Sequence, residues 1–328
     1  MKVYMLDKQF LSDADYAQLK DAFENAGHEI LFRQWTTSQE VIDGAKDADA
    51  IILMAVSITR EVIAALPNLK IISRCGIGYD NVDLEAATEH GVVVCNVPDH
   101  CTYEVACHAF TLMMALERQL VPFINRARQG GYANGKEIKC HRVRGQVLGI
   151  LGYGRIGRQL APMALGMGMT VLAYDPYVKD VETPGVTMAH SMEEVLEQAD
   201  VVSVHLYLNE ETFHMLSMPQ FRMMKKSAFL INASRGGVVN TEDLIAALKA
   251  GEIAGAGLDV AETEPLPMDH EFLSMPQVVF TPHVGMYSEE AMADMYAKLS
   301  SQALDVLAGK WPKNVVNPNV RTNTALKD

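Results

Sequence analysis

Three ionisable side chains each follow a segment that reads as a buried strand. Arg235 follows AFLIN, Glu264 follows GLDV, and His283 follows VVFTP. In an open sheet of parallel strands, ligands bind beyond the carboxyl ends, so these side chains should face one crevice. The planar fork of an arginine matches a carboxylate, and an imidazole can exchange a proton with a carbonyl or alcohol oxygen. A glutamate that reaches the imidazole would hold its tautomer and favour its charged form.

Each of the three also has a simpler interpretation. An arginine after a strand is often a surface ion pair, Glu264 stands beside Pro265 and can be a turn residue, and His283 can be a capping histidine. Their placement after three successive strand patterns favours a joint role in acid–base chemistry on an anionic substrate.

A glycine-rich turn lies between two further strand patterns, 147–151 and 170–174, and a helical pattern follows it. Gly152, Gly154 and Gly157 form G-x-G-x-x-G, in which the first glycine permits a tight turn, the second admits a pyrophosphate, and the third allows close packing of helix and strand. The helix N-terminus would supply amide groups and a positive dipole end to the phosphates. A plain strand-to-helix connection without a ligand is the alternative.

Asp175 stands at the end of the second of these strands. A carboxylate there can accept both ribose hydroxyls and would repel a 2'-phosphate, so NAD is expected as the cofactor in preference to NADP.

The elements that position these residues form two alternating regions. Strand patterns separated by helical ones predict parallel sheets with helices on both faces, that is, an α/β protein with two doubly wound sheets. The first region has strand patterns at 2–6, 29–33, 50–54, 70–74 and 92–95, with a clear helix at 13–25. The second adds strands at 201–205, 228–232, 256–260 and 278–281, and helices are expected at 102–118, then to about 130, and at 288–309.

Length and composition narrow the class of protein. A chain of 328 residues suits two domains of about 100 to 200 residues each. A net charge of −13 without a basic run argues against nucleic-acid binding. We find neither an apolar run long enough to cross a membrane nor a signal peptide, so a cytoplasmic location without membrane contact is expected.

The cysteines and nearby histidines do not form a recognisable metal motif. The sequence has five cysteines and no C-x-x-C, which fits reduced thiols in a reducing compartment. The spacing of Cys95, His100, Cys101, Cys107 and His108 matches no standard zinc pattern, so we expect buried, apolar cysteines and no metal.

Five segments together resemble the D-isomer-specific 2-hydroxyacid dehydrogenase family. They are GIGYDNVDLEAATEHGVVVCNVP, LGILGYGRIGRQL, INASRGGVVN, GLDVAETEP and TPHVGMYSEEA, in that order between about Met54 and Met292. The resemblance implies a flavodoxin-like substrate domain, 1–98 plus 291–328, into which a Rossmann NAD-binding domain, 99–290, is inserted. It also implies a homodimer formed through the NAD-binding domain, and reversible hydride transfer between NAD(H) and a small 2-oxo or 2-hydroxy acid.

The same resemblance implies roles for individual residues. Arg235 would orient the 2-oxo acid, His283 would donate the proton, and Glu264 would be its partner, while Asp259 would hold the nicotinamide carboxamide. The implied NAD contacts are Thr102, Gly152, Gly154, Arg155, Ile156, Gly157, Asp175, Ala233, Arg235, Asp259, His283 and Gly285. The implied substrate contacts are Arg74, Ile77, Gly78, Arg235, His283 and Met286.

Departures from the family pattern bear on the substrate. Met54 stands where 3-phosphoglycerate dehydrogenases of the family carry an arginine, and we recognise no serine-sensing domain after Gly309, which makes a phosphorylated substrate less favoured unless Arg60 or Arg74 replaces that arginine. Hydroxypyruvate reduction is a further alternative. The chain is also similar to the C-terminal-binding-protein corepressors, which sense NAD(H). Relative to these proteins it keeps Arg74 and has Met286 in place of a tryptophan, and a methionine there would accept a flexible or apolar substrate side chain.

Overall fold

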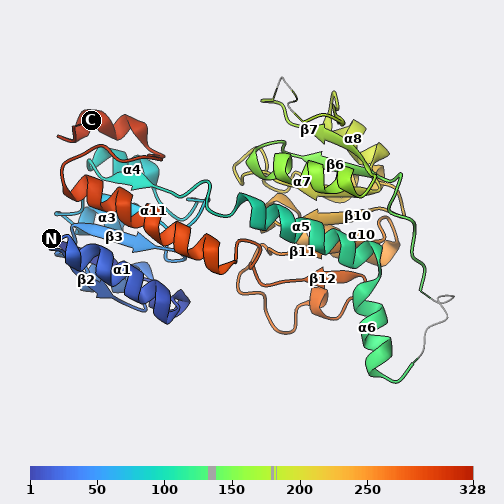
Figure 1. Ribbon diagram of the computed structural model, residues 1–328, viewed down its shortest axis with the longest axis horizontal. Coiled ribbons are helices and arrows are strands. Elements are labelled where there is room, and N and C mark those ends of the chain that lie inside the picture. The colour runs from blue at the N-terminus through green and yellow to red at the C-terminus, as the bar shows by residue number, and fades with distance from the viewer. Residues whose placement is uncertain (132–137, 179–180, 182, 328) are drawn as a thin grey trace. The chain divides into compact units, whose positions relative to one another are not determined.

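The computed structural model describes residues 1–131, 138–178, 181 and 183–327. The chain divides into two compact units, of which the first comprises 1–101 with 288–328 and the second 102–287 (Figure 1). Each unit contains one sheet in which all strands are parallel. The expected fold class, two doubly wound α/β domains, is confirmed.

The first unit has a five-stranded sheet in the order β2-β1-β3-β4-β5. Its strands are β1 (Lys2–Met5), β2 (Glu29–Phe32), β3 (Ala50–Leu53), β4 (Ile71–Arg74) and β5 (Val93–Cys95). Strand β3, in the middle of the sheet, is buried along its whole length, as expected for a parallel strand with helices on both faces. All five strands were expected from their apolar runs, and each is one residue shorter than expected.

Helices of the first unit cover both faces of this sheet. They are α1 (Asp13–Asn25), α2 (Ser38–Gly44), α3 (Arg60–Ala65), α4 (Leu84–Glu89) and α11 (Glu289–Leu307). Helix α1 begins at a capping box in which Ser12 and Asp15 bond each other's backbone amides, so its start is fixed by the local sequence. Helix α11, from the far end of the chain, buries Met295, Tyr296 and Leu299 and packs against α1 and β4.

The second unit has a seven-stranded sheet in the order β12-β11-β10-β9-β6-β7-β8. Its strands are β6 (Val147–Leu151), β7 (Thr170–Tyr174), β8 (Val186–Met188), β9 (Val201–Val204), β10 (Phe229–Asn232), β11 (Gly255–Leu258) and β12 (Val278–Phe280). Successive strands are added on one side of β6 as far as β8 and then on its other side from β9 onward. In open α/β sheets, ligands bind beyond the carboxyl ends of the strands at such a reversal, which here lies between β6 and β9.

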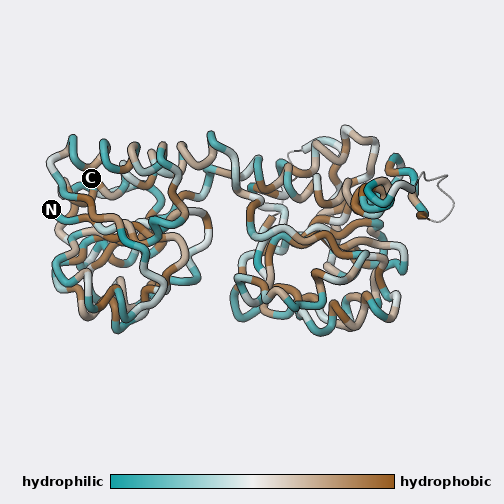
Figure 2. Tube along the Cα trace, turned by 90° about the horizontal axis from the view of Figure 1, so that it is seen from below, coloured by the Kyte–Doolittle hydropathy of each residue, from teal (hydrophilic) through white to brown (hydrophobic). Residues whose placement is uncertain are grey.

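Six α-helices belong to the described part of this unit. They are α5 (Thr102–Glu117), α6 (Leu120–Arg128), α7 (Arg155–Gly166), α8 (Met192–Gln198), α9 (Met218–Met223) and α10 (Thr241–Ala250). Helix α5 packs against α7 and against β10 and β11, so it spans much of one face. Figure 2 shows that the hydrophobic stretches of the trace lie inside each unit. In the described residues, no helix combines the length and apolarity needed to cross a bilayer.

The cysteines depart in part from expectation. Cys75, Cys95 and Cys101 are buried, whereas Cys107 and Cys140 are exposed, and all five are free thiols. The expectation that Cys107 is buried was therefore wrong. It lies on α5, whose apolar positions alternate with solvent-facing ones, and Cys107 falls on the exposed side.

Candidate active site

His283 and Glu264 form a direct pair at the carboxyl end of the second unit's sheet. His283 Nδ1 lies 2.7 Å from Glu264 Oε2, and the side chains are 42% and 39% exposed. The other carboxylate oxygen of Glu264 accepts the amide of Ala261 at 3.0 Å. Burial by itself would raise the pKa of Glu264, but the hydrogen bond and charge of His283 outweigh it and lower that pKa. The carboxylate is therefore charged near neutral pH and holds Nδ1, which leaves Nε2 for a ligand.

The backbone holds His283 in a conformation that is uncommon for a residue with a side chain. Its φ is +55°, in the left-handed region, and its amide donates to the carbonyl of Asp259 at 2.7 Å. Strain of this kind persists where surrounding contacts enforce it, and it is frequent at functional sites. The turn that follows β12 thus presents the imidazole to solvent at a fixed position.

Asp259 organises that turn. Its buried carboxylate accepts Thr281 Oγ1 at 2.6 Å, the amide of Val284 at 3.0 Å and the amide of Gly285 at 2.8 Å. Burial alone would raise the pKa of Asp259, but the hydrogen bonds from His108, Thr281 and the two amides lower it. A charged carboxylate therefore ties the residues on both sides of His283 to the end of β11.

His108, on α5, completes this network. Its Nε2 lies 2.8 Å from Thr281 Oγ1 and 3.2 Å from Asp259 Oδ1. The hydroxyl of Thr281 donates its only hydrogen to Asp259, so the Thr281 oxygen must accept from His108, and Nε2 carries a hydrogen. Reasoning from the sequence considered His108 only in a group of cysteines and histidines and assigned neither His108 nor Thr281 to this site, because their contacts with Asp259 join distant parts of the chain.

Arg235 lies on a turn shaped by the side chain of Asn232, the last residue of β10. Asn232 Oδ1 accepts the amide and hydroxyl of Ser234, and Asn232 Nδ2 donates to the carbonyl of Arg235 at 2.9 Å. The half-buried guanidinium bonds the Ser234 carbonyl at 2.9 Å, and its charge helps to lower the pKa of Glu264. The structure therefore pairs Glu264 with His283 and places Arg235 near enough for its charge to act on Glu264. Asn232 was missed, although an asparagine two residues before a serine is a recognisable turn signal.

The three glycines of the G-x-G-x-x-G turn differ in their surroundings. Gly152 has φ +91°, and a Cβ there would lie 2.4 Å from the carbonyl oxygen of His205. At Gly157 a Cβ would lie 2.6 Å from the carbonyl oxygen of Gly152, so helix α7 can approach β6 only without a side chain. Nothing lies within 4 Å of a Cβ at Gly154, where α7 begins. The turn is thus closed on two sides and open at the helix N-terminus, where amides are available to an anion.

Asp175 is tied to this turn through its carboxylate. Its Oδ2 accepts the amide of Tyr153 at 2.9 Å, and its Oδ1 accepts the amide of Tyr177 at 2.9 Å. Each oxygen keeps a further lone pair for a diol. The carboxylate therefore stands at a fixed place beside the glycine turn, as expected of a ribose ligand.

The remaining expected contacts in this unit lie on the same edge of the sheet. Arg155 and Ile156 form the first turn of α7, Ala233 follows β10, and Gly285 and Met286 follow His283. Thr102 is the first residue of α5. Gly285 is buried against Asp259 and His108, whereas Arg155 is exposed.

Arg74, Ile77 and Gly78 belong to the first unit. Arg74 ends β4, and its guanidinium bonds the carbonyl of Cys75 and lies against Gly76. The carbonyl of Ile77 accepts Asn96 Nδ2 at 2.7 Å, which fixes the loop that follows β4. The three residues therefore share one loop at the carboxyl edge of the first sheet.

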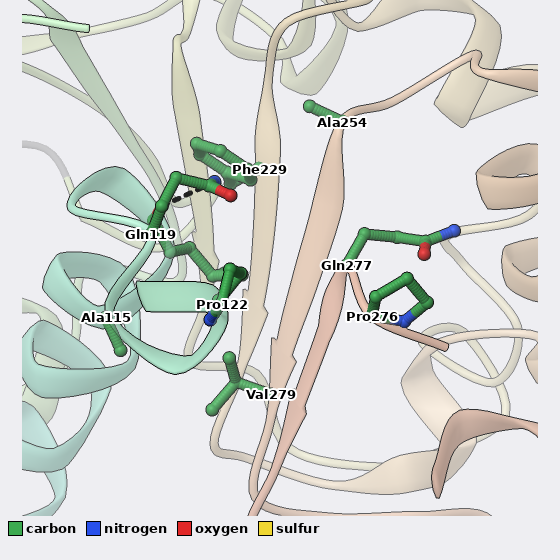
Figure 3. A pocket seen from close by; sticks show the side chains of 9 residues that line it. Ala115, Gln119, Pro122, Phe229, Ala254, Pro276, Gln277 and Val279 are labelled. Carbon is green, nitrogen blue, oxygen red and sulfur yellow. Dashed lines mark hydrogen bonds between the residues drawn. The ribbon is translucent and has the colours of Figure 1, made fainter. Parts of the chain in front are cut away.

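The second unit also has a pocket that is unrelated to these residues. It has a volume of about 210 Å³ and lies at the amino end of the sheet, where Phe229 begins β10 and Gln277 precedes β12 (Figure 3). The catalytic candidates all lie at the opposite edge, so the pocket is not part of their site. Within the described ranges, no three His, Cys, Asp or Glu side chains gather as a metal would require.

Comparison with known proteins places this site in context. Residues 110–285 match the family model described as D-isomer specific 2-hydroxyacid dehydrogenase, NAD binding domain. A glyoxylate reductase from Korarchaeum cryptofilum is 39% identical over 285 residues, covering 85% of this chain and 86% of that protein. A D-3-phosphoglycerate dehydrogenase from Methanocaldococcus jannaschii is 38% identical over 87% of this chain, but the match spans only 55% of that longer protein.

A solved structure is similar to this chain over nearly its whole length. The crystal structure of D-lactate dehydrogenase from Aquifex aeolicus complexed with NAD and lactic acid superposes with a TM-score of 0.84 and 26% sequence identity. The match covers 99% of this chain and 98% of that one. Both units of this chain therefore have counterparts in that structure.

Proposed function

Because the chain belongs to the D-isomer-specific 2-hydroxyacid dehydrogenase family, we propose that it reduces a small, unphosphorylated 2-oxo acid to the D-2-hydroxy acid, reversibly. Membership makes it an NAD-dependent oxidoreductase that acts on CH–OH groups. The single observation that supports the catalytic assignment best is the 2.7 Å contact between His283 Nδ1 and Glu264. This contact orients the imidazole so that its second nitrogen, Nε2, can donate a proton to the substrate oxygen.

Three side chains take part in the proposed reduction. Arg235 grips the carboxylate of the 2-oxo acid and presents its C2 carbonyl. Bound NADH supplies the hydride, which adds to C2 while the carbonyl π electrons move to oxygen. His283, protonated and held by Glu264, gives a proton to that oxygen, and the products are NAD⁺ and the 2-hydroxy acid. In the reverse direction the neutral imidazole takes the proton back.

We assign NAD(H) to the second unit. The open N-terminus of α7 and the glycine turn fit a pyrophosphate, and the carboxylate of Asp175 fits ribose hydroxyls. The further NAD contacts expected at Thr102, Ala233 and Gly285 belong to this proposal, whereas Met286 is assigned to the substrate side chain. The carboxylate of Asp259 already accepts several hydrogen bonds, so we assign it chiefly to anchoring the turn of His283 and secondarily to the nicotinamide carboxamide.

We assign the substrate's remaining contacts to the first unit, which serves as the substrate domain. Arg74, Ile77 and Gly78 occupy one loop at the carboxyl edge of its sheet, where ligands of open α/β sheets bind. The backbone amides of this loop suit the substrate carboxylate. The guanidinium of Arg74 adds a positive charge that favours an acid.

A homodimer and a cytoplasmic location complete the proposal. Helix α6 leaves Leu120, Val121 and Ile124 exposed at 50%, 37% and 39%. Apolar side chains gathered on one short helix favour contact with a second copy through the NAD-binding unit. Five free cysteines suit a reducing compartment.

The test is a substrate panel with NADH. Glyoxylate, pyruvate, hydroxypyruvate, branched 2-oxo acids and phosphohydroxypyruvate are offered at equal concentration, and the chirality of each product is determined. We expect oxidation of NADH with at least one unphosphorylated acid and a D product. Turnover of phosphohydroxypyruvate alone would indicate 3-phosphoglycerate dehydrogenase chemistry. The 38% identity to an enzyme of that name favours this alternative. NADH binding without turnover of any acid would indicate an NAD(H)-sensing protein similar to the corepressors.

A further inference from the structure

A histidine–carboxylate pair outside the network described above lies on the same edge of the sheet as His283 and Glu264. His214 Nε2 is 2.7 Å from Glu262 Oε2, and the two side chains are 30% and 28% exposed. His214 lies in the connection between β9 and α9, and Glu262 precedes Glu264 by two residues. No step of the reaction proposed above uses this pair.

The hydrogen bonds of His214 define the tautomer of its imidazole. Asn240 Oδ1 accepts the amide of Asp243 at 3.0 Å, which fixes the orientation of the Asn240 side chain. Asn240 Nδ2 therefore faces His214 Nδ1 at 3.2 Å and donates to it. Because Nδ1 accepts, the hydrogen of the neutral ring lies on Nε2 and is donated to Glu262. The ring is also stacked on Phe213, with centroids 3.9 Å apart.

Glu262 connects three segments of the chain. Its second oxygen, Oε1, accepts the amide of Thr241 at 2.7 Å, at the start of α10. Burial alone would raise the pKa of Glu262, but the hydrogen bonds from Thr241 and His214 outweigh it and lower that pKa. A charged carboxylate therefore joins the end of β11 to the start of α10 and to the β9–α9 connection.

The turn that carries Arg235 lies between these connected segments. On one side, the amide of His214 donates to the carbonyl of Gly237 at 2.8 Å. On the other side, Gly236 packs so closely that a Cβ would lie 2.0 Å from the carbonyl of Ala261. The backbone around Arg235 thus contacts both segments, one through a hydrogen bond and the other through close packing.

We infer that His214 and Glu262 are positioning residues that hold the turns of Arg235 and Glu264 against each other. The inference rests on the proposed function, because it takes Arg235 as the ligand of the substrate carboxylate. The glycine turn follows β6, whereas the pair joins segments that follow β9, β10 and β11. Its loss should therefore weaken binding of the 2-oxo acid far more than binding of NADH, because the glycine turn and Asp175 lie on other segments.

Two variants at one position test the role. His214→Ala removes the donor to Glu262, whereas in His214→Gln the amide nitrogen can donate from nearly the same place. With the best substrate of the panel, we expect the KM of His214→Ala to rise about tenfold, the scale of one lost charge-assisted hydrogen bond. Its Kd for NADH should stay within about twofold, and His214→Gln should restore most of the KM. Lys249→Ala is the matched control, since it breaks an exposed ion pair with Glu271 in the same unit.

Hydrogen exchange measured by mass spectrometry provides a readout that does not need turnover. In His214→Ala, peptides covering 234–240 and 261–264 should exchange faster than in the parent, while a peptide covering 147–157 should not change. Parental exchange in those peptides, a parental KM despite faster exchange, or an equal loss of NADH affinity would each overturn the inference. If the parent turns over no 2-oxo acid, the proposed function fails, and the exchange data still decide whether the pair holds the two turns.

Discussion

A single carboxylate, Asp175, is expected to decide between NAD and NADP. It is held by the amides of Tyr153 and Tyr177, so it cannot turn away from a 2'-phosphate without losing both bonds. Asp175→Ala should weaken NADH binding and reduce the preference for NADH over NADPH by at least about tenfold. The ratio of kcat/KM values for the two cofactors measures this. An unchanged ratio would contradict the ribose assignment.

His205 makes stability depend on pH. This histidine is half-buried directly after β9, its Nδ1 is shielded from solvent, and this burial lowers its pKa to about 4. The unfolded chain binds the proton near pH 6.5, so the stabilising contribution is complete above that pH and is lost as the pH falls toward 4. His205→Gln should therefore show a shallower loss of stability over this range, by up to about 1.4 kcal/mol per pH unit.

The check on His205 is a series of urea unfolding curves between pH 7 and pH 4, followed by a signal from the second unit. His190→Gln, at an exposed position of the same unit, is the control. If the free energy of unfolding fell with the same slope against pH in the parent and in His205→Gln, the ring of His205 would not set the pH dependence of stability.

Residues at the ends of strands were the part of the site that could be predicted from the sequence. Arg235, Glu264 and His283 each follow an apolar run, and parallel strands bring their carboxyl ends to one edge. Their supporting partners could not be predicted in this way. His108 and His214 meet Asp259 and Glu262 across long separations in the chain, and nothing in the local pattern marks a side chain whose partner is chosen by tertiary packing.

At the scale of elements, the start of α7 depends on the absence of a side chain at Gly157. Gly157→Ala would place a methyl group 2.6 Å from the carbonyl oxygen of Gly152 and 3.1 Å from the side chain of Ile150. The helix would have to move away from β6, so we expect a loss of stability of about 1–3 kcal/mol and a clear loss of NADH affinity. Thermal unfolding and NADH titration measure the two effects.

Gly166, at the other end of the same helix, is the matched control. Nothing lies within 4 Å of a Cβ there, and Gly166→Ala should be neutral or slightly stabilising. If the two alanine variants bound NADH equally well, close packing at the glycine turn would not be what the cofactor site requires.

The elements themselves were largely predictable because buried parallel strands are short apolar runs. Strands β6 and β7 and helix α1 begin and end at the expected residues, and α5 differs by one residue. Strand β8 was missed. Its residues Val186, Thr187 and Met188 are only partly buried or exposed at the edge of the sheet, so no apolar run marks it.

At the scale of the whole molecule, the alternation of strands and helices was enough to predict two parallel sheets. The association of the last helix with the first region came instead from the family resemblance. In the structure α11 packs against α1 and β4, and both contacts join residues more than 200 positions apart. Periodicity within a helix shows that one face is buried but not which distant surface covers it.

The proposed homodimer is tested by the mass of the particle in solution. Leu120→Asp with Ile124→Asp places two charges on the exposed apolar side of α6 and should shift light scattering from twice the chain mass to the chain mass of 36.1 kDa. Met268→Asp, at an isolated exposed methionine, is the control. A parent that is monomeric, or a dimer unaffected by the double variant, would contradict an interface on α6.

The decisive measurement is the turnover of His283→Ala beside its binding of NADH. If His283 delivers the proton, kcat for the best 2-oxo acid should fall by about 10² to 10⁴. The Kd for NADH should remain within about twofold, because the glycine turn and Asp175 are untouched. Reduction of the 2-oxo acid at the parental rate would contradict the assignment of the proton donor, and with it the catalytic site described above.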